Sequence, residues 1–196
     1  MRPSTARVER WTAEEAMKLG REEAIELWKT LPAPASGEMD GEYTGYVRDG
    51  GDEQVRKAKA AFFFDEHSRL GYWMGKAYTT TVGLKGEGYN RWRRPGGKVE
   101  RYLRFSTEIA PSGMDGKPSL IMYYRAFNNR MGNVDLIDEI RKLDDGLYLG
   151  IYTTSVPVAG FAEVKREGER SEVEVFALTG PVGKWVGVDD EGAERK

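Results

Sequence analysis

From Tyr72 onward the chain is a succession of β-prone segments separated by short turns rich in Gly, Pro, Asn and Asp. Such turns suit the loops that join antiparallel neighbours, and no helical periodicity interrupts the series. The pattern therefore predicts an antiparallel meander. The expected strands span residues 72–81, 87–94, 98–109, 117–127, 133–143, 146–154, 158–167 and 171–179.

A further β-prone segment at 41–47 brings the expected number of strands to about nine. A meander of this length has two edges with unpaired backbone groups, and closure into a barrel removes both. The high aromatic content, with Tyr the commonest ring, and the 24 Gly residues agree with a body made of strands and tight turns.

Two helical segments are expected before the meander. Thr12 and Glu15 have the spacing of a capping box, which predicts a helix over 13–31 that a glycine divides into two pieces. A second helix, capped by Asp52, is expected over 52–70. The fold class predicted is mainly β, an antiparallel β-barrel of about nine strands capped by the N-terminal α-helices.

The chain of 196 residues has room for one domain but not comfortably for two. The barrel domain, with its helices, is expected over residues 12–181. A flexible arm is expected at 1–11, which has little apolar content to bury, and a flexible tail at 182–196, which runs into the acidic stretch 189–192.

Composition excludes several kinds of chemistry. The chain has no cysteine, which excludes disulfides, thiolate metal sites and cysteine nucleophiles. His67 is the only histidine, so neither a multi-histidine metal site nor a Ser-His-Asp triad on another histidine can form. We expect no metal and no cofactor. The sequence shows no apolar run of about 20 residues and no signal-peptide pattern, which predicts a cytoplasmic protein without a membrane span.

Three short stretches of the chain form a set of motifs. They are residues 25–32 followed by 41–45, residues 71–76 with Trp-Met-Gly-Lys, and residues 136–150 with Asp-Glu-Ile-Arg. This set resembles the bacterial GXWXG-domain proteins of unknown function, although Tyr43 stands where their first motif has Trp. The wider resemblance is to the calycins, the lipocalin-like and fatty-acid-binding-like barrels. It implies a barrel around a central cavity and names no ligand.

Aromatic side chains are the candidates to line such a cavity. Regular alternation puts Lys76 and Tyr78 on one face of strand 72–81 and Trp73 on the other. The pattern does not decide the facing of strand 117–127. The side chains expected around a ligand are Trp73, Tyr78, Phe105, Tyr123 and Tyr124.

Charged residues on the strands are the candidates for the polar end of the cavity. Asp138 lies among Leu and Ile residues, and a buried carboxylate needs a partner. Arg141, three residues later, is on the opposite face of a regular strand, so Asp138 is expected to pair with Lys76 or Arg125. A structural ion pair and a ligand anchor or proton-transfer group both stay open.

Two hypotheses share this scaffold. In the first, the protein binds a small hydrophobic or aromatic metabolite, with or without a carboxylate, and Lys76, Asp138, Arg125 and Arg141 orient its polar end. In the alternative, the protein is an isomerase, cyclase or lyase. Asp138 or Glu108 would then act with a Tyr or Lys76 as general acid and base.

A third hypothesis concerns the hairpin from Arg91 to Arg104, which places aromatic rings between positive charges. Such a surface can bind nucleic acid. The formal net charge of −2 argues against nucleic acid as a partner, because general polyanion binders are strongly basic. The identity of the ligand and the oligomeric state are left open by the sequence.

Overall fold

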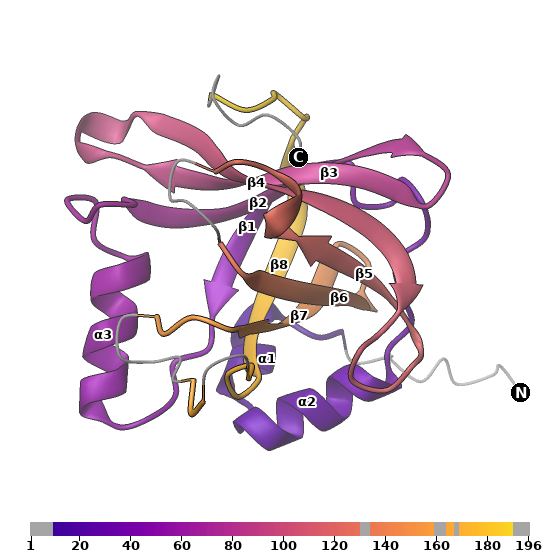
Figure 1. The fold of residues 1–196 in the computed structure, drawn as a ribbon, viewed down its shortest axis with the longest axis horizontal. Helices are drawn as coiled ribbons and strands as arrows, with labels where there is room; N and C mark the ends of the chain where they lie inside the picture. Colours follow the sequence, from indigo (N-terminus) through magenta and orange to yellow (C-terminus); the bar gives the residue numbers. More distant parts are fainter. Residues whose placement is uncertain (1–9, 130–133, 159–163, 167–168, 190–196) are drawn as a thin grey trace, which may run out of the picture.

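Eight antiparallel strands close into a barrel in the computed structural model, which describes residues 10–129, 134–158, 164–166 and 169–189. Each strand pairs with its sequence neighbours, and β1 pairs with β8 to complete the ring (Figure 1). The strands are β1 (Gly41–Val47), β2 (Tyr72–Val82), β3 (Lys85–Arg93), β4 (Val99–Pro111), β5 (Pro118–Tyr123), β6 (Leu136–Asp144), β7 (Leu147–Thr154) and β8 (Glu174–Gly183).

The prediction of a mainly β antiparallel barrel is confirmed, with eight strands in the described part instead of about nine. The strand expected over 158–167 falls largely outside the described residues, and residues 164–166 are not in a strand. The strand expected to reach residue 127 ends at Tyr123, where a 3₁₀ turn over Tyr124–Ala126 begins.

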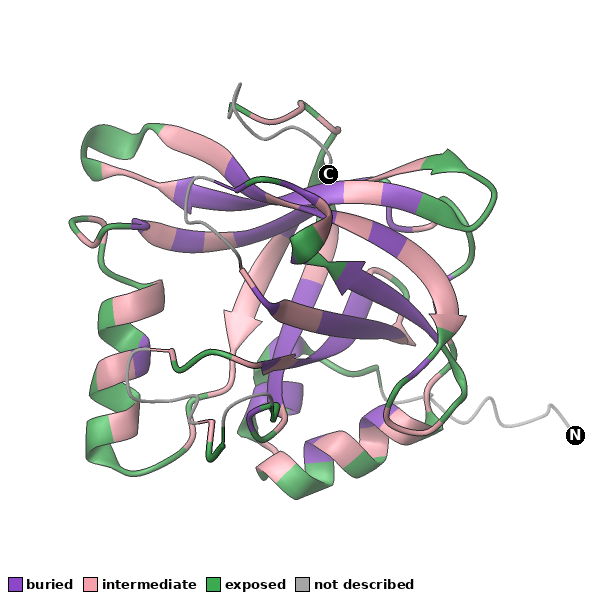
Figure 2. Cartoon of the chain, viewed as in Figure 1, coloured by how far each residue is buried: buried purple, intermediate pink, exposed green. Residues whose placement is uncertain are grey.

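The two N-terminal helices, α1 (Ala13–Lys18) and α2 (Arg21–Thr30), cover the outer wall of β7 and β8 (Figure 1). Of the helices expected to cap the barrel, these two therefore lie against its wall and not across one of its ends. The outward residues of these two strands are apolar and pack against the helices. Both faces of the strands are therefore buried (Figure 2). The cluster contains Ala13, Ala16, Met17, Ala24, Trp28, Leu147, Leu149, Ile151, Val175 and Ala177.

One end of the barrel is filled with side chains. Met39, from the loop after α2, is buried there against the core of the barrel. The ring centroid of Tyr43 lies 5.9 Å from that of Tyr78 and 5.6 Å from that of Tyr148, both in edge-to-face geometry. Aromatic rings in this arrangement interdigitate closely, so this half of the interior has no room for a ligand.

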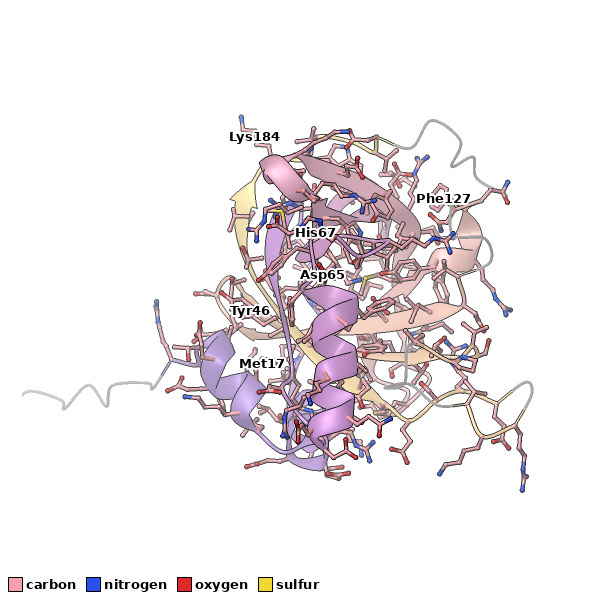
Figure 3. All side chains as sticks on the ribbon, turned by 90° about the vertical axis from the view of Figure 1, so that its left-hand side faces the viewer. Met17, Tyr46, Asp65, His67, Phe127 and Lys184 are labelled. Carbon is pink, nitrogen blue, oxygen red and sulfur yellow. The ribbon has the colours of Figure 1, made fainter. Side chains whose placement is uncertain are left out.

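The other end is covered by α3 (Glu53–Phe63), which joins β1 to β2 and lies in front of the barrel in Figure 3. Asp52 caps the helix as predicted, accepting a hydrogen bond from the Val55 N–H at 2.9 Å. The helix ends at Phe63 and not at residue 70, because a turn follows in which Asp65 accepts a hydrogen bond from the His67 N–H. His67 is exposed in that turn.

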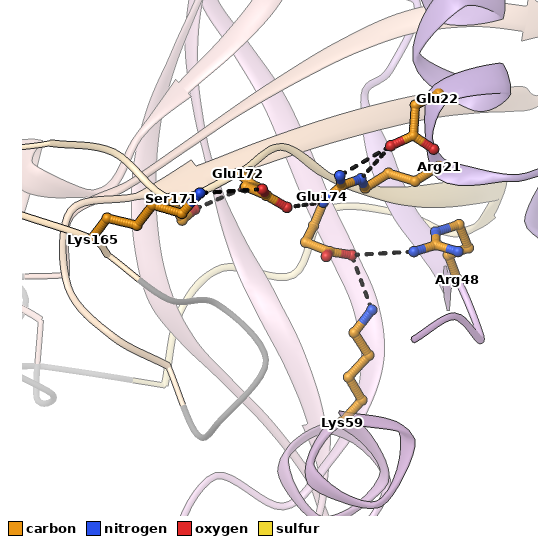
Figure 4. A network of polar contacts seen from close by, with 8 residues as sticks. All are labelled: Arg21, Glu22, Arg48, Lys59, Lys165, Ser171, Glu172 and Glu174. Atoms are coloured by element: carbon orange, nitrogen blue, oxygen red, sulfur yellow. Dashed lines mark hydrogen bonds and ion pairs between the residues drawn. The ribbon is translucent and has the colours of Figure 1, made fainter. Parts of the chain in front are cut away.

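A buried lysine holds α3 in place. The Lys59 ammonium lies 2.9 Å from a carboxylate oxygen of Glu174 at the start of β8 (Figure 4). The same oxygen lies 3.9 Å from the guanidinium of Arg48, which follows β1. All three side chains are largely buried, so the pairing ties the helix to both strands that close the ring.

Candidate functional site

A cavity of about 310 Å³ lies inside the barrel, between α3 and the filled end. Its volume is at the lower end of the range for small-molecule sites, and most of its wall is apolar. The lining side chains are Val47, Phe62, Phe63, Leu70, Trp73, Lys76, Asn90, Trp92, Leu103, Tyr124, Val134, Asp135, Leu136, Asp138, Tyr152, Thr154, Val156, Pro157, Val158 and Phe176.

A β-bulge brings Trp73 and Lys76 to the same face of β2. The pairing with β3 slips between Trp73 and Gly75, so regular alternation fails at this point and the two side chains both line the cavity. Gly75 has φ 126°, and a Cβ there would lie 2.2 Å from the Tyr43 carbonyl oxygen. Only glycine fits this position. The bulge corrects the expectation that Trp73 and Lys76 face opposite sides of the strand.

Lys76 is the centre of a polar cluster in the cavity wall. Its Nζ lies 2.8 Å from Oδ2 of Asp138 and donates to the Asn90 side-chain oxygen at 3.1 Å and to the Tyr124 hydroxyl. The Tyr124 hydroxyl in turn donates to Asp138 at 3.2 Å. Of the two partners expected for Asp138, the structure places Lys76 beside it.

Aromatic rings surround the Lys76 ammonium. The ring centroids of Trp73, Phe105, Tyr124 and Phe176 lie 5.2 to 5.8 Å from its Nζ. Burial lowers the pKa of Lys76, and the neighbouring Asp138 carboxylate opposes that shift in part. Burial and the same carboxylate raise the pKa of Tyr124 well above its ordinary value. The cluster therefore joins two groups with displaced proton affinities.

Two aromatic residues expected in the cavity wall lie beneath it instead. Tyr78 and Phe105 are 2% and 0% exposed and belong to the filled half of the barrel, where their ring centroids are 5.6 Å apart. The Tyr78 hydroxyl donates a hydrogen bond to the sulfur of Met122 at 3.4 Å. Phe105 reaches the site only as one of the rings near Lys76.

Three other predicted site residues lie outside the cavity. Tyr123 is 37% exposed, because β5 points Met122 inward and Tyr123 outward. The Arg125 side chain is 65% exposed and lies 2.8 Å from Asp135. The Glu108 side chain is 42% exposed and faces Lys85 at 3.7 Å on the outer surface. These placements correct the expectation that the three side chains reach a ligand.

Arg141 is fully buried on the outer side of the barrel wall, as strand alternation from Asp138 requires. It forms a bidentate pair with Asp115, at 2.6 and 2.8 Å, and donates to the Trp28 carbonyl at 3.3 Å. Its guanidinium stacks 3.8 Å from the Trp28 ring. Arg141 therefore fixes α2 to the wall, which corrects its assignment to the ligand site.

Sequence reasoning missed several lining residues. Asn90 bridges the cluster: its oxygen accepts from Trp73 Nε1 at 3.0 Å, and its amide donates to the Leu103 carbonyl at 3.2 Å and the Tyr124 hydroxyl at 3.0 Å. Leu103 has φ 56° at a second bulge, where Tyr102 and Leu103 are both buried. The sequence did hold a signal for Asn90: an amide side chain in the middle of an aromatic-rich strand indicates a buried group that needs hydrogen-bond partners.

The cationic side chains of the Arg91–Arg104 hairpin are paired with carboxylates. Arg91 and Arg101 contact Glu42 at 3.1 and 2.7 Å, and Arg104 contacts Glu87 at 2.8 Å. The whole hairpin lies within the described residues, and these contacts neutralise much of its charge.

Among the described residues no three His, Asp or Glu side chains gather closely enough to hold a metal ion. In the same part of the chain, the helices are too short and too polar to cross a lipid bilayer.

No family model and no curated protein matches this chain. A crystal structure of a protein from Thermomonospora curvata is similar, with 19% sequence identity, a TM-score of 0.49, and coverage of 82% of this chain and 87% of that one. At this identity and score the similarity adds nothing to the fold already described.

Proposed function

We propose that the protein binds a small hydrophobic or aromatic molecule inside its barrel. The observation that carries the proposal is the apolar cavity of about 310 Å³ beside a filled half-barrel. Protein interiors are normally packed without voids of this size, and a wall of aromatic and aliphatic side chains favours an apolar occupant. The resemblance to calycins, which hold ligands in the same place, supports this proposal.

The charges of the site favour a neutral ligand. Lys76 is already paired with Asp138 at 2.8 Å, and Asp135 with Arg125 at the same distance. A carboxylate would have to displace one of these partners and would leave a charge buried without compensation. A ligand without a carboxylate therefore fits the site better than one with it.

The proposal is tested by titration with N-phenyl-1-naphthylamine, a neutral dye that fluoresces in apolar surroundings. One saturable site is expected. Leu136→Trp should abolish binding, because Leu136 lines the cavity and a larger ring fills it. Ile137→Trp, the next residue on β6, lies outside the lining and should leave binding unchanged. Absence of saturable binding, or equal binding by the two variants, would contradict the proposal.

A second candidate function is acid–base catalysis in the same cavity. It is favoured by one observation: Lys76 and Tyr124, both with displaced pKa values, contact one another and Asp138 in the cavity wall. Groups arranged in this way can move a proton to or from a bound molecule.

Proton transfer is tested with a ketone such as 4′-ethylacetophenone in deuterated water. If the cluster acts as a base, the protein should accelerate exchange of the protons next to the carbonyl, as measured by NMR, and Lys76→Met should remove the acceleration. If the ketone binds and exchanges no faster than in buffer, the protein acts as a binder only.

A further inference from the structure

Every hydrogen-bond donor of the polar cluster around Lys76 is paired without a ligand. The three N–H groups of its ammonium have three acceptors, on Asp138, Asn90 and Tyr124. The Tyr124 hydroxyl donates to Asp138, and the Asn90 amide donates to Leu103 and Tyr124. An acceptor group of a ligand would have to displace one of these contacts, so the cluster is a poor place for the acceptors of a ligand.

Two other lining side chains have the opposite property. Trp92 Nε1 and Tyr152 Oη are buried and have no hydrogen-bond partner in the part of the chain that is described. Both residues line the cavity, and they are only 2% and 9% exposed. A buried donor without an acceptor is costly, and a bound molecule that supplied the acceptor would remove that cost.

The two donors lie on opposite walls. Trp92 is on β3 and Tyr152 is on β7, which are four strands apart in a ring of eight. A molecule that satisfies both must therefore reach across the barrel with an acceptor toward each side. The wall between them is apolar, with Leu103 and Phe176 among its residues.

Building on the proposed function, we infer that the ligand is a neutral aromatic molecule with two carbonyl-type acceptors at opposite ends, bound by Trp92 and Tyr152. Neither donor atom is accessible to water in the cavity, so this binding mode requires the two side chains to turn toward the ligand. The Lys76 cluster then shapes the cavity without contacting the acceptors directly.

Three probes of similar shape test this assignment. They are 1,4-diacetylbenzene with two acceptors, 4′-ethylacetophenone with one, and 1,4-diethylbenzene with none. Their dissociation constants are measured by competition against the dye on the wild type, Trp92→Phe and Tyr152→Phe. Each substitution should weaken the diketone about fivefold to tenfold, the value of one hydrogen bond, and should change the hydrocarbon less than about twofold.

The change in hydrocarbon affinity measures the effect of the volume that Trp92→Phe removes. Trp185 lies on the outer surface beside Tyr89, so Trp185→Phe is the control and should change no dissociation constant. Equal losses for all three probes would overturn the assignment and leave the proposed function intact. A selective loss of the diketone in Tyr124→Phe instead would assign the acceptors to the Lys76 cluster. Failure of every probe to bind would contradict the proposed function itself.

Discussion

Lys76 and Asp138 form an ion pair whose side chains are 6% and 4% exposed. Desolvation cancels much of the attraction in such a pair, but removal of one partner leaves a buried charge alone. We therefore expect Lys76→Met to lower the free energy of unfolding by about 3–5 kcal/mol, as measured by urea denaturation. The double variant Lys76→Met/Asp138→Leu should regain more than half of that loss. Additive losses from the two substitutions would show that the pair is not the source of the effect.

Asp115 gives the molecule an acid-sensitive contact. Its bidentate pair with Arg141 lowers the pKa of the carboxyl from 3.8 to about 2. A depressed folded-state pKa stabilises the folded state above the unfolded pKa, and this stability is lost as pH falls through the folded value. The contribution is about 2 kcal/mol.

The matched variant is Asp115→Asn. The difference in unfolding free energy between wild type and this variant should be constant from pH 7 to about pH 5 and should shrink between pH 4 and pH 2. A difference that does not depend on pH would show that Asp115 does not act through its charge.

For single residues, the sequence indicated which side chains form buried ion pairs better than it indicated their partners. A carboxylate among aliphatic residues indicated a buried pair, and Lys76 was one of two partners considered for Asp138. Arg141 was misassigned, because its partner Asp115 lies in a turn 26 residues away in sequence that no strand pattern connects to it. Long-range pairing depends on register, which local patterns do not contain.

Gly75 is the element-scale feature on which the site depends, because its bulge turns β2 so that Trp73 and Lys76 both face the cavity. A Cβ at this position meets backbone 2.2 Å away, so Gly75→Ala should cost more than about 3 kcal/mol of unfolding free energy and abolish dye binding. Gly83 also has positive φ, at 59°, but nothing lies within 4 Å of its added Cβ. Gly83→Ala should cost only about 1 kcal/mol and leave binding intact. If the two variants lost the same unfolding free energy and the same dye binding, the close contact of Gly75 with β1 would not be what the site depends on.

The Lys59–Glu174 pair makes a prediction about α3. Lys59→Met should loosen the helix over the cavity, so its backbone amides should exchange with deuterium about tenfold faster. The dye should also dissociate faster. Lys57→Met, an exposed position on the same helix whose side chain is 76% exposed, is the control and should change neither rate. Unchanged exchange in Lys59→Met would mean that the apolar contacts of α3 hold it alone.

Elements with a local physical signal were predicted well. The capping box at Thr12 and the cap at Asp52 marked the starts of α1 and α3, and glycine- and proline-rich turns marked the hairpins. The end of α3 was placed too late, because three consecutive Phe residues hid the turn at Asp65. The bulges at Gly75 and Leu103 were not foreseen, since each is one residue of slip within a regular pattern.

The whole molecule is a barrel filled at one end and hollow at the other. The sequence predicted that the sheet closes into a barrel, because an open meander leaves two edge strands with unpaired backbone groups. It did not predict which half is hollow, since that depends on where a loop residue such as Met39 packs and on how α3 lies across the opening. The inferred ligand depends on two donors, Trp92 Nε1 and Tyr152 Oη, and only the folded structure shows that both lack a partner among the described residues.

The indole N–H signals of the five tryptophans test the central claim most directly. In an NMR titration with the neutral dye, the account predicts that the signals of Trp73 and Trp92, in the cavity wall, shift and saturate at one equivalent. The signals of Trp28, under α2, and of Trp185, on the outer surface, should stay in place. Shifts at Trp28 or Trp185 with none at Trp73 and Trp92 would place the ligand outside the barrel and contradict the account.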